Sequence, residues 1–361
     1  MTAASQTALR VVLVVAVSLA ALEAVSRAVE WLGPAEQSHS GSQRWMSETF
    51  NNPSDNPLGL PVGMRVPKPR SDSRLHGVNV HLNRWGVRAS EDVTARRQGE
   101  QARVLIVGDS VAFGQGLGAT ETIAAQLSRR LTRRCKASVE VFTLACPGWG
   151  MHDTLRALSA ALEHFELDAV VMLWTLNDLV FDERGRSEAR RPWGTGNSAL
   201  LRLWSKIARA SQGRDPAVAL AEASTATARG RLSAMEPVLK RLDGQCDRVS
   251  GGCTVAITPY ATQLDPTIAA EVARAWGLST PGALATARLP QRLACEASAS
   301  HKLPCVDLAV SLTAPDPRAL YQRGAKGRLD YVHLNGAGTA RIAEHLAARV
   351  TLPKARCSTA P

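Results

Sequence analysis

Residues 104–110 read Val-Leu-Ile-Val-Gly-Asp-Ser, a short and fully apolar run that ends in three turn-forming residues. Such a run is typical of a strand buried on both faces of a parallel sheet. Further along, Ile123, Leu127 and Leu131 lie one helical turn apart, and Thr122 is a suitable N-cap. A buried strand followed by an amphipathic helix predicts the first half of a βαβ unit.

The same alternation continues to the end of the chain. Four further apolar runs predict strands, at residues 139–144, 169–174, 254–257 and 303–308. Helical patterns separate them, and Ile342, Leu346 and Val350 mark a closing helix. Strands that alternate with helices imply a parallel sheet with right-handed crossovers. We therefore predict an α/β domain over residues 100–355, built on a central parallel sheet of about five strands.

The composition excludes some function classes. Of the 361 residues 45% are hydrophobic, which is enough for a core, and the formal net charge is +11. The arginines are scattered, apart from short pairs at residues 129–130, 133–134 and 190–191, which we assign to solvated faces. No nucleic-acid-binding module is recognisable, so we expect no nucleic-acid partner.

The N-terminus predicts export. Residues 11–22 are apolar except for Ser18, and Arg10 precedes them. This run is shorter than the ~20 residues that cross a bilayer, but extending it to residues 8–32 reaches that length. Both a cleaved signal peptide and an uncleaved signal anchor fit residues 1–32, and the lack of a clean cleavage site favours the anchor. We expect the rest of the chain on the periplasmic or extracellular side, tethered to the inner or cytoplasmic membrane by this one helix.

Two segments interrupt the α/β pattern. Residues 33–82 are rich in Pro, Ser, Asn and Gly and show no sustained strand or helix period, which predicts either a stem or an extended wrap over the domain, and we assign residues 33–99 to this extended stem and lead-in. Residues 184–248 are long for a single crossover and contain helical patterns. For this insertion, a lid over the substrate and a packed helical hairpin remain equally open.

Cysteine spacing fits an exported protein. Two sequence-local pairs are plausible disulfides, Cys246 with Cys253 and Cys295 with Cys305. Cys135 and Cys146 could form a third pair or be buried thiols, which leaves Cys357 as the expected odd residue. The spacings lack the short C-x-x-C pairs of zinc sites, so we predict no metal.

The turn after residue 107 places the Ser110 hydroxyl at the carboxyl end of a central strand, where backbone N–H groups entering a helix can stabilise an oxyanion. A serine needs a base to act as a nucleophile. Asp330 and His333 lie three residues apart, so the carboxylate can hold one imidazole nitrogen while the other faces the serine. Two further donors could come from Gly148, after the second strand, and from the Asn177 amide, after the third.

These residues resemble a known family over roughly residues 103–350. Four motifs occur in the order of the four blocks of the SGNH/GDSL hydrolases: Gly108-Asp109-Ser110, Gly148, Asn177 and Asp330-x-x-His333. The resemblance implies a flavodoxin-like three-layer α/β/α sandwich and no cofactor. Residues 83–88, which read Asn-Arg-Trp-Gly-Val-Arg, also resemble the lead-in of membrane-anchored bacterial members.

The resemblance also implies a role for each motif residue. Ser110 would be the nucleophile, His333 the base and Asp330 its partner, while the oxyanion hole would comprise Ser110, Gly148 and Asn177. The chain departs from the family pattern in the second block, where Thr143 replaces the usual Asn, and Gly150 therefore remains possible as the donor. In the third block Thr175 stands where Gly is common, which would narrow the pocket.

The predicted function is a serine esterase that acts through an acyl-enzyme on acyl esters, O-acetyl in particular, of a cell-envelope carbohydrate or lipid. An O-acyltransferase would use the same triad. A non-catalytic envelope protein on this fold is an alternative of another class. Nucleotide binding by the glycines at 114, 116 and 118 fits poorly, because no G-x-G-x-x-G directly follows the strand and no Walker lysine is present. The sequence does not determine the oligomeric state.

Overall fold

The computed structural model describes residues 18, 20–25, 27, 49–51, 56–61, 64–89, 93–97, 99–180, 225–275, 288–324 and 327–357. The chain divides into two units, Met1–Ser42 with Ala189–Arg214, and Gln43–Glu188 with Asp215–Pro361. Most of the predicted anchor lies outside the described residues. In its described part, which is helical, Arg27 Nε pairs with Glu23 at 3.0 Å. No helix within the described ranges combines the length and apolar composition that a bilayer span requires.

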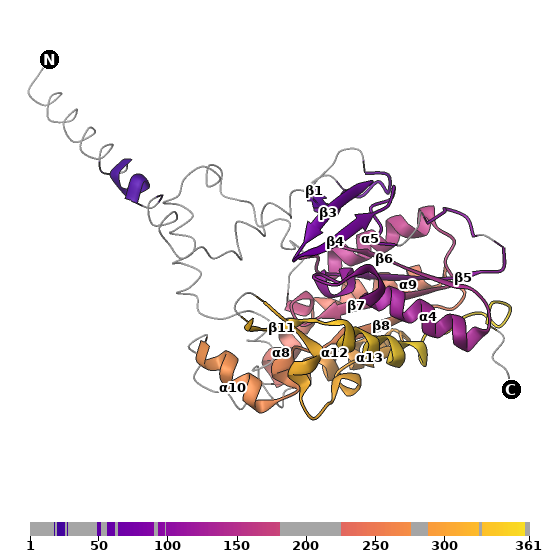
Figure 1. Ribbon diagram of the computed structural model, residues 1–361. Helices are drawn as coiled ribbons and strands as arrows, with labels where there is room; N and C mark the ends of the chain where they lie inside the picture. The colour runs from indigo at the N-terminus through magenta and orange to yellow at the C-terminus, as the bar shows by residue number, and fades with distance from the viewer. Residues whose placement is uncertain are drawn as a thin grey trace, which may run out of the picture. The chain divides into compact units, whose positions relative to one another are not determined.

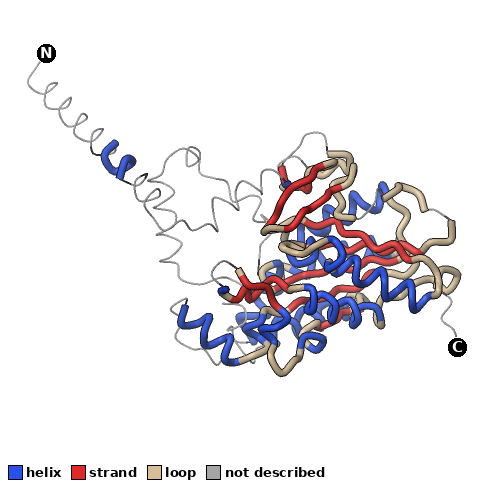
Figure 2. Tube along the Cα trace, in the orientation of Figure 1, coloured by secondary structure: helices blue, strands red, loops and turns tan. Residues whose placement is uncertain are grey.

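Five parallel strands form the central sheet of the second unit in the order β6-β5-β7-β8-β9 (Figures 1 and 2). They are β5 (Ala102–Gly108), β6 (Val139–Ala145), β7 (Ala169–Thr175), β8 (Cys253–Thr258) and β9 (Cys305–Asp307). The first strand lies between the second and third, which is the flavodoxin-like order. The predicted fold class and all five predicted strands are thus confirmed.

Helices cover both faces of this sheet (Figure 1). α4 (Ile123–Cys135) packs against α13 (Gly336–Ala347) on one face, and α5 (Met151–His164) packs against α9 (Met235–Cys246) on the other. Right-handed crossovers produce this arrangement, because the chain first steps from β5 outward to β6 and then returns past β5 to β7. The other helices described within this unit are α3 (Ser110–Phe113), α8 (Thr225–Leu232), α10 (Pro266–Ala275) and α12 (Leu289–Ser300), with short 3-10 helices at Ala119–Glu121, Asp178–Val180, Ala261–Gln263, Val310–Leu312 and Pro317–Leu320.

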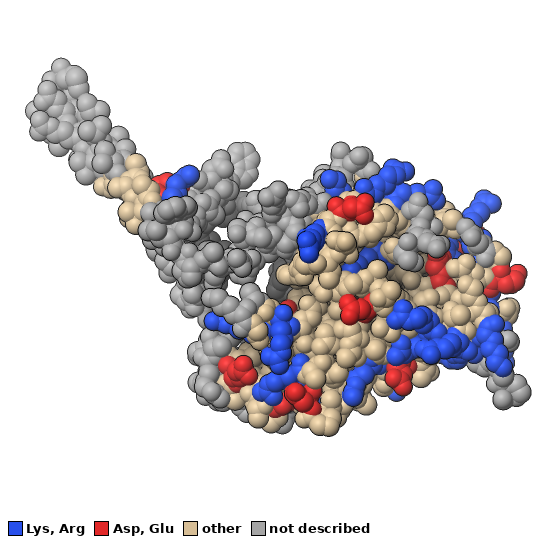
Figure 3. All heavy atoms as spheres, in the orientation of Figure 1, with Lys and Arg blue, Asp and Glu red and all other residues tan. Residues whose placement is uncertain are grey.

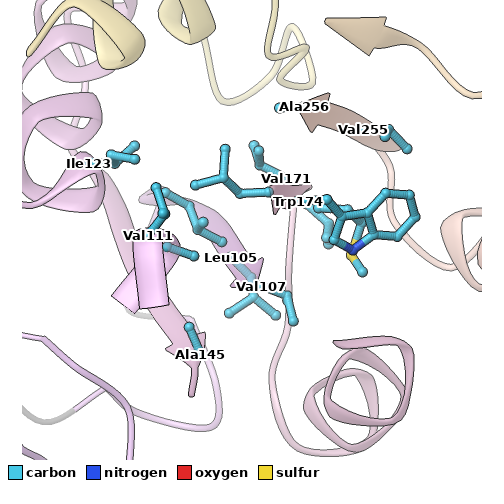
Figure 4. Packing of buried hydrophobic residues seen from close by; sticks show 14 of the residues in the cluster. Leu105, Val107, Val111, Ile123, Ala145, Val171, Trp174, Val255 and Ala256 are labelled. Carbon is cyan, nitrogen blue, oxygen red and sulfur yellow. The ribbon is translucent and has the colours of Figure 1, made fainter. Parts of the chain in front are cut away.

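The core lies between the sheet and its helices. Every residue of β5, β7 and β8 is buried, as continuous apolar strands in a covered parallel sheet require. Figure 4 shows part of this core, with Leu105 and Val107 of β5, Val171 of β7 and Val111 of α3 among the packed residues. The packed sheet gives the residues that follow its strands a rigid support.

The lead-in segment contains strands that the sequence pattern did not predict. β1 (Phe50–Asn51) pairs with β2 (Val66–Pro67), and β3 (Ser71–Leu75) forms an antiparallel hairpin with β4 (Val78–Leu82). β3 reads Ser-Asp-Ser-Arg-Leu, so its polar composition conceals it. The expectation that this segment contains no strands is wrong for these residues. Their apolar side chains belong to the same core cluster as the sheet, so the described lead-in is a packed wrap over the domain.

Three disulfides form within the described residues. Cys246–Cys253 and Cys295–Cys305 confirm the two predicted local pairs. The third joins Cys135 at the end of α4 to Cys357, and Cys146 is a buried free thiol. The expectation that Cys357 is the odd cysteine is therefore wrong. Cys135, at the C-terminal end of α4, lies far from Cys357 in the sequence, and the two residues meet only in the folded chain.

Much of the predicted insertion at residues 184–248 lies outside the described residues, so the choice between a lid and a packed hairpin stays a prediction. Its described end forms α8 and α9. α9 buries Met235, Leu239 and Leu242 and is the crossover helix between β7 and β8. The helical pattern predicted around these residues is confirmed as part of the packed domain.

Candidate active site

The segment that carries Ser110 is shaped by its neighbours. A Cβ on Gly108 would lie 2.3 Å from the Leu173 carbonyl oxygen, so only glycine lets β5 approach β7 this closely. Asp109 caps α3 by accepting a hydrogen bond from the Val111 N–H at 2.9 Å. Ser110 is the first residue of this helix, which directs its hydroxyl out of the carboxyl edge of the sheet while the residue stays buried.

Asp330 and His333 reach Ser110 from β11 (Leu329–Leu334), which pairs with β10 (Tyr321–Arg323). His333 Nε2 lies 2.9 Å from Ser110 Oγ, and His333 Nδ1 lies 2.7 Å from Asp330 Oδ2. The other Asp330 oxygen accepts the backbone N–H groups of Val332 and His333, both at 3.0 Å. The structure therefore brings together a hydroxyl, an imidazole and a carboxylate in the order that general-base activation of a serine requires.

Electrostatics within this group oppose the effect of burial. Burial lowers the pKa of His333, but the hydrogen bond and charge of Asp330, with the charge of Asp109, outweigh it and raise the pKa above 6.5. Burial raises the pKa of Asp330, but the hydrogen bond and charge of His333 and two backbone N–H groups bring it below 3.8. Asp330 is therefore ionised at neutral pH and stabilises a positive charge on the imidazole.

Asn177 follows β7 and belongs to a buried polar network. Its Nδ2 donates to Asp109 Oδ2 at 3.3 Å and to Asp178 Oδ1 at 3.2 Å, while its Oδ1 accepts the hydroxyl groups of Tyr260, at 3.0 Å, and Thr175. Ionised carboxylates only accept hydrogen bonds. The end of the Asn177 side chain that faces Asp109 and Asp178 is therefore the NH2 group.

Thr175 lies behind this amide rather than in an open pocket. It is 1% exposed, and its hydroxyl oxygen also lies 3.2 Å from Asp109 Oδ2. The expectation that Thr175 narrows the pocket is therefore wrong, because the side chain is enclosed by the network that orients Asn177. Tyr260, which follows β8, was not predicted, since a single Tyr after a strand gives no signal in the sequence.

Gly148 and Gly150 have different roles in the turn after β6. Gly148 has a φ of +84°, and its N–H donates to no described residue. Gly150 is the N-cap of α5, and its N–H faces Asp153 Oδ2 at 3.4 Å. Of the two glycines considered from the sequence, Gly148 has the N–H group that is free of a described acceptor.

The lead-in segment supplies further residues at the site. The buried Arg88 guanidinium donates to the carbonyl oxygens of Phe113, at 2.7 Å, of Gly114, at 2.6 Å, and of Leu117. It thereby stabilises the end of the short helix that starts at Ser110. The loop at residues 114–118 therefore directs carbonyl groups toward the Arg88 guanidinium. A phosphate-binding loop instead directs backbone N–H groups toward its ligand.

His76 lies at the tip of the β3–β4 hairpin and faces Gln115, with 3.1 Å between His76 Nε2 and Gln115 Nε2. Burial and the charge of His333 lower the pKa of His76. Neither Arg88 nor His76 was predicted as a site residue, because their positions depend on how the wrap folds back. The His76-Gly77 pair, a two-residue hairpin turn with positive φ at both positions, is the signal that could have located the hairpin.

Charged side chains elsewhere on the domain are mixed in sign. On the face shown in Figure 3, Lys and Arg lie among Asp and Glu. Of the arginine pairs expected on solvated faces, Arg129 and Arg133 are exposed, and residues 190–191 lie outside the described residues. Arg134 of this set joins two segments, since its guanidinium donates to the carbonyl oxygens of Ala347 and Val350, at the end of α13 and just after it. Within the described ranges, no group of three His, Cys, Asp or Glu side chains is arranged to hold a metal ion.

Comparison with known proteins gives one family match. The model of the GDSL-like Lipase/Acylhydrolase family matches residues 106–341. No curated protein matches the chain. Among solved structures, a lipase/acylhydrolase from Enterococcus faecalis has a TM-score of 0.39 at 16% identity, covering 70% of this chain and 98% of that one. A carbohydrate acetylesterase from Sinorhizobium meliloti has a TM-score of 0.39 at 12% identity, covering 69% of this chain and 98% of that one.

Proposed function

We propose, from the premise that this chain belongs to the GDSL-like lipase/acylhydrolase family, that it is a serine esterase working through an acyl-Ser110 intermediate. One observation carries the proposal: His333 Nε2 lies 2.9 Å from Ser110 Oγ while His333 Nδ1 lies 2.7 Å from Asp330 Oδ2. A hydroxyl held in this way can lose its proton to the imidazole as it attacks a carbonyl carbon.

The reaction proceeds in two halves. His333 Nε2 takes the Ser110 proton as Oγ attacks the ester, and the tetrahedral intermediate collapses when the imidazolium returns that proton to the leaving alkoxide. A water molecule then gives its proton to His333, attacks the acyl-serine and releases the acid with the Ser110 hydroxyl restored. Asp330 stabilises the imidazolium in both halves and keeps the Nδ1–H tautomer.

Three donors are suited to the oxyanion. The N–H groups of Ser110 and Gly148 and the amide of Asn177 follow β5, β6 and β7, which are neighbours in the sheet. Their residues therefore meet at one edge, where donors fixed in advance stabilise charge that develops during the reaction. These roles for Gly148 and Asn177 are part of the proposal, in which Asn177 Nδ2 gives up its 3.3 Å contact with Asp109 to donate to the oxyanion.

Acyl esters of a cell-envelope carbohydrate or lipid, O-acetyl esters in particular, are the substrates we assign. The basis is location. The apolar N-terminal run suits export with a membrane tether, and the three disulfides suit an oxidising compartment. Esters of such a polymer or lipid are the acyl compounds that an exported esterase would meet.

Labelling with a fluorophosphonate tests the mechanism. The wild type should be modified at Ser110, Ser110→Ala should not react there, and His333→Ala should react far more slowly. Equal labelling of His333→Ala would contradict the proposal. Product analysis with acetylated glycans, with water and sugar hydroxyls in competition, separates hydrolysis from acyl transfer because the two differ only in the acceptor of the acyl group.

A further inference from the structure

Arg65 is held firmly beside the turn that contains Gly148. It lies in the lead-in, between Met64 and Val66, which are both buried. Its backbone carbonyl accepts the Trp149 indole N–H at 2.6 Å. The Arg65 backbone is thus anchored to the turn after β6, although it belongs to a segment outside residues 106–341 that match the family.

The Arg65 guanidinium extends over this turn while its side chain remains exposed. Nη1 donates to the Pro147 carbonyl at 3.3 Å and lies 3.5 Å from the position that a Cβ on Gly148 would occupy. Among the described residues no carboxylate forms an ion pair with it, and only one of its five N–H groups donates to another described residue. The remaining donors are available to a ligand at Gly148.

We infer that Arg65 is a specificity-determining residue that binds an anionic substituent of the substrate next to the scissile ester. The inference rests on the proposed function, since Gly148 marks the reacting carbonyl only if its N–H contacts the oxyanion. The substituent would be a carboxylate, phosphate or sulfate, on either the acyl or the alcohol part, because a guanidinium binds each of these through paired N–H groups.

Negatively charged side chains around Ser110 make a nearby cation important for the binding of an anionic substrate. Asp109, Asp178 and Asp330 all belong to the networks around Ser110 and Asn177. An anionic substrate that approaches these carboxylates is repelled unless a cation offsets them. A neutral ester is neither repelled by these carboxylates nor attracted by Arg65. Comparing charged and neutral substrates therefore separates a substrate-binding role of Arg65 from a purely structural role.

The experiment compares kcat/KM for two matched pairs of esters, each an anionic ester and its neutral methyl ester. Mono-4-nitrophenyl succinate places the charge on the acyl part, and 4-acetoxybenzoate places it on the alcohol part. Arg65→Gln should lower kcat/KM by about 3- to 10-fold for the anionic member of at least one pair, with the neutral member unchanged. Arg65→Lys should retain part of the preference, and Arg133→Gln, on the exposed face of α4, should change neither.

The outcomes separate the possibilities. A selective loss in one pair supports the inference and identifies the part of the substrate that carries the charge. Equal losses for both members of each pair would show that Arg65 only supports the Pro147 turn, and unchanged rates would show that it does not contact substrate; either result overturns the inference. Hydrolysis of the neutral esters that is abolished in Ser110→Ala keeps the proposed function intact in both cases, whereas hydrolysis that survives Ser110→Ala overturns the proposed function itself.

Discussion

Asp330 holds His333 at two points: one carboxylate oxygen lies 2.7 Å from the imidazole Nδ1, and the other accepts the His333 backbone N–H at 3.0 Å. The two contacts fix both the ring and the strand that carries it. They also keep the proton on Nδ1, so that Nε2 is free to accept the proton of Ser110.

Asp330→Asn should therefore disable the base without removing it. An amide at this position can donate to Nδ1, which favours the tautomer with its proton on Nε2. We expect kcat for 4-nitrophenyl acetate to fall by about 10²- to 10⁴-fold with little loss of folded structure. Circular dichroism of the variant provides the folding control. A decrease of less than about tenfold would mean that the carboxylate does not determine the tautomer.

The pH dependence of kcat/KM should reflect His333. The neutral imidazole is the active form, and Asp330 and Asp109 raise its pKa above 6.5 against the effect of burial. Activity should therefore be full at alkaline pH and be lost as the pH falls through a midpoint above 6.5. Asp330→Asn should move the His333 midpoint, measured by NMR, to lower pH.

His76 provides the control for this titration, since its imidazole interacts electrostatically with His333. Its pKa is lowered by burial and by the charge of His333, so it stays neutral while His333 titrates. His76→Gln should leave the midpoint of kcat/KM almost unchanged. A large shift of the midpoint in this variant would mean that His76, and not His333, is the group that titrates.

Asn177 should contribute to the transition state rather than to the ground state. Asn177→Ala removes the Nδ2 donor and should lower kcat by about 10²- to 10³-fold, with a smaller change in KM. Tyr260→Phe removes only the hydroxyl that lies 3.0 Å from Asn177 Oδ1, so its effect on kcat should be weaker. Equal effects of the two substitutions would indicate that the network, and not the amide, limits the rate.

The sheet and the triad could be predicted because both have local signals. Apolar runs predict buried strands, and the Gly108-Asp109-Ser110 turn and the Asp330-x-x-His333 spacing are short motifs. The positions of the wrap could not be predicted in this way. Arg65 and Arg88 meet the turns after β6 and α3 through contacts between residues far apart in the chain, and no local pattern encodes such contacts.

Arg88 should be a major contributor to stability as well as to the position of Ser110. Arg88→Gln leaves carbonyl groups of the loop after α3 without a donor, and we expect the free energy of unfolding to fall by about 2–4 kcal/mol. Urea unfolding measures this loss, and Arg133→Gln on the exposed face of α4 should cost little. A stable variant with normal kcat would show that other groups can satisfy those carbonyls.

The Cys135–Cys357 disulfide should stabilise the fold without affecting catalysis. It closes a loop with a sequence separation of 222, so it restricts the unfolded chain far more than Cys246–Cys253, whose separation is 7. Cys135 ends the helix that leads into β6, so it lies near the amino ends of the strands, whereas Ser110 lies at their carboxyl ends. Cys357→Ser should therefore lower the free energy of unfolding by about 2–5 kcal/mol and leave kcat unchanged. If urea unfolding showed no loss relative to the wild type, or if kcat fell in the folded variant, the disulfide would not have this purely structural role.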